Sequence, residues 1–213
     1  MRRREVTQFF RPGRAAADFC ENSSRRVNEV FRAAATLQEF CQRQKWRFCF
    51  IGGLAVQRWA DPRQTEDAHL TLLTGFTGED SYIDALLSAF APRFTDERKL
   101  APLRRVLFLQ SSEGVALDIA LGAVPFEEHS VERATDWKVE KLRLRTCSAE
   151  DLIVHKAFAG RELDWADVTS IIMRQGRKLN VEQIWSELRP LVELKEEPEI
   201  LEKLQRLLDQ NLD

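Results

Sequence analysis

Three polar residues on two expected strands have the chemistry to hold a divalent cation. Asp67 and His69 stand two positions apart at the start of an expected strand, so their side chains project from the same face. Asp118 lies in the apolar segment 117–121, where a carboxylate is costly unless it is paired, hydrogen-bonded or bound to a cation. Two neighbouring strands that both offer inward-facing acids build an oxygen-ligand Mg²⁺ site. The alternative for Asp118 is an ordinary salt bridge to an arginine.

Two consecutive glycines have the geometry to bring the backbone close to an anion. Gly52 and Gly53 follow the apolar segment 47–51 and precede a helix-like segment, 54–59. Glycine at a strand-to-helix junction allows the close approach, and the first turn of the helix presents free N–H groups. A strand-to-helix turn also needs glycine for steric reasons in many folds, and this alternative stays open.

The order and spacing of these residues resemble the polymerase-β-type nucleotidyltransferase superfamily. The resemblance covers about residues 48–167 and is closest to the bacterial nucleotidyltransferase toxins of the abortive-infection AbiE type. The residues that carry it are Gly52, Gly53, Arg63, Thr65, Asp67, His69, Asp118, Lys156, Arg161, Asp164 and Asp167.

The resemblance implies a fold, an activity and a set of roles. The fold is α/β (α+β): a small mixed-sheet nucleotidyltransferase core with flanking helices, followed by a C-terminal helical domain. The activity is transfer of a nucleotide from an NTP to a hydroxyl acceptor, either an RNA such as a tRNA 3′ end or a protein, by metal-assisted attack on the α-phosphate. The implied catalytic residues are Asp67, His69, Asp118 and Lys156, the first three being ligands of Mg²⁺ or Mn²⁺; the implied nucleotide-binding residues are Gly52, Gly53, Arg63, Thr65 and Lys156. Asp164 and Asp167 would be accessory polar groups.

His69 stands where the superfamily has its second acid. At its ordinary pKa a histidine is neutral at pH 7, and it is a poor Mg²⁺ ligand, though acceptable to Mn²⁺ or Zn²⁺. Glu66 cannot replace the missing acid, because adjacent strand residues point to opposite faces. Either the site works with one metal or a different metal, or the domain is degenerate and binds a nucleotide, RNA or a partner without catalysis. A structural histidine with satisfied hydrogen bonds is the remaining alternative.

The elements that must position these residues follow from periodicity and turn chemistry. Strands are expected over 47–51, 70–73, 105–110, 115–121 and 141–145, with a hairpin turn over 111–114. A helix capped by Ser23 or Ser24 should precede them, and two more should cover 54–59 and 82–90. From residue 148 onward helices are expected over 149–160, 163–175, 181–188 and 198–209, broken at Gly160, Gly176 and Pro190. The predicted organisation is a basic arm (1–22), an α/β domain (23–146) and a helical domain (147–213).

Composition sets the class of protein. The chain has 213 residues, of which 44% are hydrophobic and 31% charged, as in ordinary globular proteins. No apolar run is long enough for a membrane helix, no secretory signal is expected, and the four cysteines show no metal-ligand spacing. These features favour a cytoplasmic protein with reduced thiols and no membrane partner.

The charge is distributed unevenly along the chain. Residues 1–63 carry 13 Lys and Arg against 6 Asp and Glu, whereas the remainder carries 19 against 28. A basic first third is compatible with an RNA partner, and a solvated surface is the alternative. The toxin-like resemblance adds a possible cognate antitoxin or other partner protein, for which the apolar stripe Leu201, Leu204 and Leu208 of the last helix is a candidate surface.

Two further constellations are weaker. Asp61, Arg63 and the cluster 127–129 are candidates for the rim of a site, although solvated loops are the simpler interpretation. Cys147 and His155 are not expected to form a nucleophile pair, because nothing in the sequence places them in a cleft.

Overall fold

The fold is built on a mixed sheet of seven strands. The structure, a computed structural model, describes the backbone of residues 14–212 and the side chains of residues 29–212. The strands are β1 (Phe48–Ile51), β2 (Asp67–Leu73), β3 (Ala91–Pro92), β4 (Val106–Gln110), β5 (Ala116–Gly122), β6 (Thr135–Val139) and β7 (Leu142–Thr146). Their order is β3-β4-β5-β2-β1-β7-β6; β2 runs parallel to β5, β1 runs parallel to β7, and the other neighbours are antiparallel.

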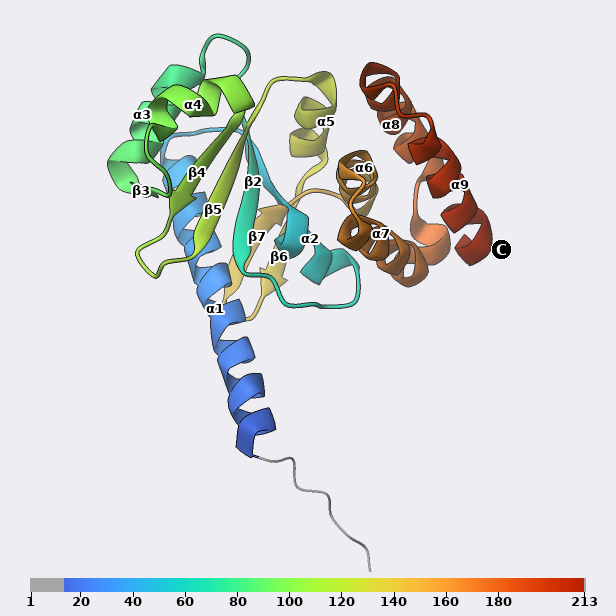
Figure 1. Ribbon diagram of the computed structural model, residues 1–213, viewed down its shortest axis with the longest axis horizontal. Coiled ribbons are helices and arrows are strands. Elements are labelled where there is room, and N and C mark those ends of the chain that lie inside the picture. Colours follow the sequence, from blue (N-terminus) through green and yellow to red (C-terminus); the bar gives the residue numbers. More distant parts are fainter. Residues whose placement is uncertain (1–13, 213) are drawn as a thin grey trace, which may run out of the picture.

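The described helices flank this sheet and then form a bundle of their own (Figure 1). They are α1 (Arg14–Arg43), α2 (Gly52–Trp59), α3 (Glu79–Ala89), α4 (Glu97–Arg104), α5 (Pro125–Arg133), α6 (Ala149–Ala159), α7 (Glu162–Gln175), α8 (Val181–Lys195) and α9 (Glu199–Leu212), with a short 3₁₀ helix, η1 (Gly176–Lys178). A mixed sheet with flanking helices, followed by helices from residue 149 onward, confirms the predicted fold class.

Alternating burial along the strands divides the core into two layers. On one face of the sheet, leucine and isoleucine side chains of β2, β4 and β5 are buried against α1, α3 and α4. Figure 1 shows α1 passing behind β4 and β5. The second layer joins Cys49 of β1, Ala55 and Val56 of α2, and Phe126 and Val131 of α5 to the four C-terminal helices. One hydrophobic cluster therefore crosses the predicted domain boundary at residue 147.

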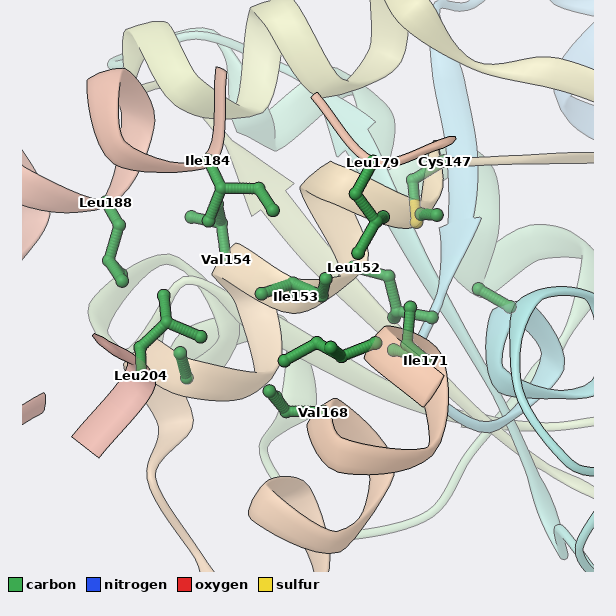
Figure 2. Close-up of a cluster of buried hydrophobic side chains, with 14 of the residues drawn as sticks. Cys147, Leu152, Ile153, Val154, Val168, Ile171, Leu179, Ile184, Leu188 and Leu204 are labelled. Carbon is green, nitrogen blue, oxygen red and sulfur yellow. The ribbon is translucent and has the colours of Figure 1, made fainter. Parts of the chain in front are cut away.

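The C-terminal helices are held together by aliphatic side chains around α6. Figure 2 shows Leu152, Ile153 and Val154 of α6 among residues of α7, α8 and α9. Leu204 and Leu208 are 0% and 4% exposed, so this part of the last helix's apolar stripe is core. The stripe is not a free partner surface, because burial against α6–α8 already removes it from water.

The helix boundaries that differ most from the sequence predictions are the start of α1 and the end of α8. α1 begins at Arg14 and not at Ser23 or Ser24, because the run Arg14–Ala17 has high helix propensity. Residues 14–22 of the predicted basic arm are therefore helical, and residues 1–13 lie outside the described residues. α8 continues through Pro190 to Lys195. Pro190 is exposed, so the carbonyl left without its N–H partner faces water and the helix is not broken.

None of the helices described between residues 14 and 212 is both long and apolar enough to span a bilayer.

Candidate functional site

The junction between β1 and α2 is packed too closely for any residue but glycine. Gly52 has a φ of +61°, in the left-handed region, and a Cβ there would lie 2.8 Å from His69 Nδ1. A Cβ on Gly53 would lie 2.1 Å from Thr65 Oγ1. Both positions therefore require glycine for steric reasons, which confirms the alternative interpretation of this pair. Binding of the triphosphate at the same turn stays a prediction.

The two strands that carry the acids are parallel neighbours. His69 on β2 lies directly opposite Asp118 on β5, and Asp67 is two residues before His69 on the same face. His69 Nε2 lies 3.1 Å from Asp67 Oδ2 and 3.3 Å from Asp118 Oδ2. One ligand atom from each residue lies within 4.8 Å of the others. The structure thus brings together the three residues that the sequence predicted as metal ligands, which we call the acid cluster.

His69 is charged in this environment. Burial alone would lower the pKa of its imidazole, but the hydrogen bonds to Asp118 and Asp67, together with their charges, raise the pKa from 6.5 to about 9. In return, the hydrogen bond from His69 lowers the pKa of Asp67 below its ordinary value. This shift favours an imidazolium at pH 7, whereas a histidine at its ordinary pKa would be neutral, and the positive charge between the two carboxylates neutralises part of theirs.

Arg93 is a member of the site that the sequence did not indicate. Its Nη2 lies 3.0 Å from Asp118 Oδ1, so the salt-bridge alternative for Asp118 is also present in the structure. Oδ1 is nevertheless buried and makes no hydrogen bond of acceptable geometry with a described residue. Arg93 follows the short edge strand β3, a position that neither a motif nor a period would single out.

A buried charge network joins the helical bundle to the segment before β2. Lys156 Nζ lies 2.7 Å from Asp164 Oδ1 and 2.8 Å from Asp167 Oδ2. Asp167 also accepts two hydrogen bonds of 2.7 Å from Arg63, whereas Asp164 accepts two from Arg161, of 2.6 and 3.4 Å. Burial opposes ionisation of both aspartates, but these hydrogen bonds outweigh it and lower the pKa of each. The two aspartates, whose roles the sequence could not separate, thus hold different arginines.

This network holds in place the segment that precedes Asp67 in the chain. Arg63, tied to Asp167, precedes Thr65, and Thr65 Oγ1 lies 3.2 Å from Asp67 Oδ1 and donates to it. Asp164 and Asp167 are 1% and 3% exposed, and Lys156 is 7% exposed. Removing either carboxylate would leave Lys156 with a single partner and one arginine without its carboxylate, so the network is a rigid anchor for the start of β2.

A cavity of about 480 Å³ connects the glycine turn, the acid cluster and the buried network. The lining residues that the sequence singled out for the site are Gly52, Gly53, Arg63, Thr65, Asp67, His69, Lys156 and Asp164. Arg161, whose side chain is 74% exposed, also lines it. Asp118 is not among the lining residues and lies behind His69, toward β4.

The weaker candidates lie elsewhere. Glu127 caps the start of α5 by accepting hydrogen bonds from two backbone N–H groups, and His129 lies 3.0 Å from Glu187 of α8. Burial raises the pKa of the Cys147 thiol well above its ordinary value, so this cysteine is not a nucleophile. His155 does line the cavity, and its Nε2 lies 3.5 Å from Ser130 Oγ.

Comparison with solved structures places this architecture among the nucleotidyltransferases. An antigenic nucleotidyltransferase-like protein from Paracoccidioides brasiliensis shares 15% sequence identity at a TM-score of 0.50, over 84% of this chain and 93% of that chain. The antibiotic-resistance factor ANT(2'')-Ia shares 12% identity at a TM-score of 0.56, over 82% of this chain and 96% of that chain. No protein-family model matches the chain, and the comparison with curated proteins gives no match either. The structural likeness shows that the chain has a nucleotidyltransferase fold.

Proposed function

We propose that this protein transfers a nucleotide from an NTP to a hydroxyl acceptor. The observation that carries the proposal is the position of Asp67 and Asp118 on parallel neighbouring strands, within reach of one cation and beside the cavity that begins at Gly52. The nucleotidyltransferase fold supports it. The acceptor classes that we consider are RNA and a protein hydroxyl.

The acid cluster fits one divalent cation. Two carboxylates and one imidazole offer three ligand atoms within 4.8 Å of one another, and the buried Oδ1 of Asp118 lacks a hydrogen bond. This donor set favours Mn²⁺ or Zn²⁺ over Mg²⁺, because an imidazole is softer than a carboxylate. A bound cation would orient the attacking hydroxyl and neutralise charge at the α-phosphate. Since only a neutral imidazole is a ligand, His69 must release its proton first.

The remaining residues bind and orient the nucleotide. Lys156 has three N–H donors, of which two face Asp164 and Asp167, so one remains for a phosphate oxygen. The exposed guanidinium of Arg161 adds a second cation at the cavity wall. Gly52 and Gly53 let the backbone approach the triphosphate, and Thr65 holds Asp67 in place.

The test is transfer of α-labelled nucleotide, from each of the four NTPs, to bulk RNA and protein with Mg²⁺ or Mn²⁺. We expect Asp67→Asn and Asp118→Asn to abolish transfer without unfolding the chain. Asp136→Asn is the matched control, because its carboxylate is half exposed in a surface pair with Arg143. Full activity in either site variant would refute the assignment of the acid cluster.

A second candidate function is a degenerate module that binds a nucleotide, RNA or a partner such as an antitoxin without catalysis. The observation that favours it is charge compensation: His69 and Arg93 together balance the charges of Asp67 and Asp118 without a metal. His69→Asp distinguishes the two candidates. Transfer that appears only in this variant would mean that histidine disarms the natural site.

A further inference from the structure

The sheet face that carries Asp118 continues onto β4 and stays open to solvent. Phe108 of β4 lies directly opposite Asp118 of β5, so both side chains stand on the same face. Val106, Ala116 and Ala120 on that face are partly exposed, whereas the residues that alternate with them are buried under α1, α3 and α4. Among the described residues, the open face extends from the acid cluster to the edge of the sheet.

Two phenylalanines and two arginines form a surface on this face, which we call the aromatic–basic platform: Arg93, Phe94, Arg104 and Phe108. The guanidinium carbons of Arg93 and Arg104 lie 4.9 and 4.7 Å from the centre of the Phe108 ring. The rings of Phe94 and Phe108 meet edge to face at 5.7 Å, and Phe94 is 53% exposed. Phe108 thus contacts both guanidinium groups, of which that of Arg104 is also paired with Glu97 at 2.7 Å, while Phe94 presents its ring to solvent.

Arg93 connects the platform to the acid cluster. The same guanidinium lies 5.4 Å from the centre of the Phe94 ring and, through Nη2, 3.0 Å from Asp118 Oδ1. Its Nε is buried and has no hydrogen-bond partner among the described residues. A molecule that lies against Phe94 and Arg93 would therefore have its neighbouring groups close to Asp118 of the acid cluster.

We propose that the aromatic–basic platform binds the acceptor of the transfer reaction, and that this acceptor is the end of a single-stranded RNA. Any nucleobase can stack on an exposed aromatic ring. An adjacent arginine can bind a phosphate or stack on the plane of a base. A protein hydroxyl carries no phosphate for the guanidinium groups. This acceptor site presupposes the nucleotidyl transfer proposed above.

The test is binding of a short fluorescein-labelled single-stranded RNA, measured by anisotropy in EDTA and without NTP. Phe94→Ala should raise the Kd about tenfold or more, because it removes one stacked base, and Phe94→Trp should retain binding. Phe76→Ala is the matched control: Phe76 is 66% exposed and lies 5.1 Å from the guanidinium of Arg105, but it follows the opposite end of β2 from Asp67. It should change the Kd less than twofold, and the melting temperature of each variant reports folding.

Three results would overturn the platform: no binding of RNA by the natural protein, equal binding by Phe94→Ala, or equal affinity for the same RNA as a duplex. Because the binding assay contains neither nucleotide nor metal, it is independent of transfer. If RNA binding depends on Phe94 but the protein has no transferase activity, the proposed function is refuted. The platform would then remain as an RNA-binding surface. Transfer to protein alone, together with an RNA affinity that Phe94→Ala does not change, would refute the proposal that the platform binds RNA. The proposed nucleotidyl transfer would still stand.

Discussion

His69 should make the stability of the protein depend on pH in the neutral to alkaline range. In the folded chain the two carboxylates raise the pKa of its imidazole from 6.5 to about 9. A group whose pKa is higher in the folded state binds its proton more tightly there, so its stabilisation is complete below pH 6.5 and is lost as the pH rises to 9.

The size of the effect follows from the same values. The rise of the pKa corresponds to about 3 kcal/mol of unfolding free energy. Because 31% of the side chain is exposed, solvent screening reduces this to about 2 kcal/mol. We therefore expect the unfolding free energy to fall by about 2 kcal/mol between pH 6.5 and pH 9 through His69 alone.

The assay is urea unfolding at several pH values across this window, in EDTA, for the natural protein and for His69→Gln. The difference between the two curves isolates the histidine. His129→Gln is the control for the loss of an imidazole, because His129 pairs with Glu187 outside the site. Two parallel curves for the natural protein and His69→Gln would refute the assignment of an imidazolium between the two aspartates.

Further predictions concern the glycine turn, the buried network and the metal. Gly52→Ala should lower the unfolding free energy by about 1–3 kcal/mol more than Gly75→Ala. Both positions have a left-handed φ, but only a Cβ at position 52 would clash with His69. Equal losses in urea unfolding would contradict the packing described. Asp167→Asn should cost about 3–5 kcal/mol, because it leaves Arg63 without its carboxylate and leaves Lys156 with Asp164 alone. Asp136→Asn in an exposed pair should cost less than about 1 kcal/mol, and similar midpoints for the two variants in a denaturant titration would refute the anchor. Mn²⁺ should raise the melting temperature more at pH 8.5 than at pH 6.5, because binding displaces the proton of His69; an equal shift at both pH values, or the same shift in Asp118→Asn, would exclude the acid cluster as the binding site.

Local sequence patterns were sufficient to predict much of the sheet. Strands β4 and β5 follow from the alternation of apolar residues, and the turn between them from the Ser111–Gly114 segment, in which Gly114 has a φ of +82°. Both signals involve only residues close in sequence. By contrast, α5 and β6 had no such signal: Phe126 packs against His155, and Trp137 against Phe31 of α1, so their burial depends on distant partners.

Local sequence patterns likewise predicted one part of the candidate site, and the pairing of distant strands determined the other. The common face of Asp67 and His69 follows from the two-residue period of a strand. The position of Asp118 beside them requires β2 and β5 to pair in parallel at one register, and Arg93 reaches Asp118 only because β3 lies at the edge of the sheet beside β4.

The sequence by itself determined most of the candidates for chemistry, the segments with a clear period or turn signal, and the mixed α/β fold, but it did not indicate Arg93 or the elements β3, α4, α5 and β6. Only the tertiary structure decided the charge of His69, the double pairing of Asp118, the anchoring of Arg63 by Asp167, and the platform beside the acid cluster. The physical reason is that residue type and period are local properties, whereas a pKa or an ion pair depends on charges brought within a few ångströms by chain pairing.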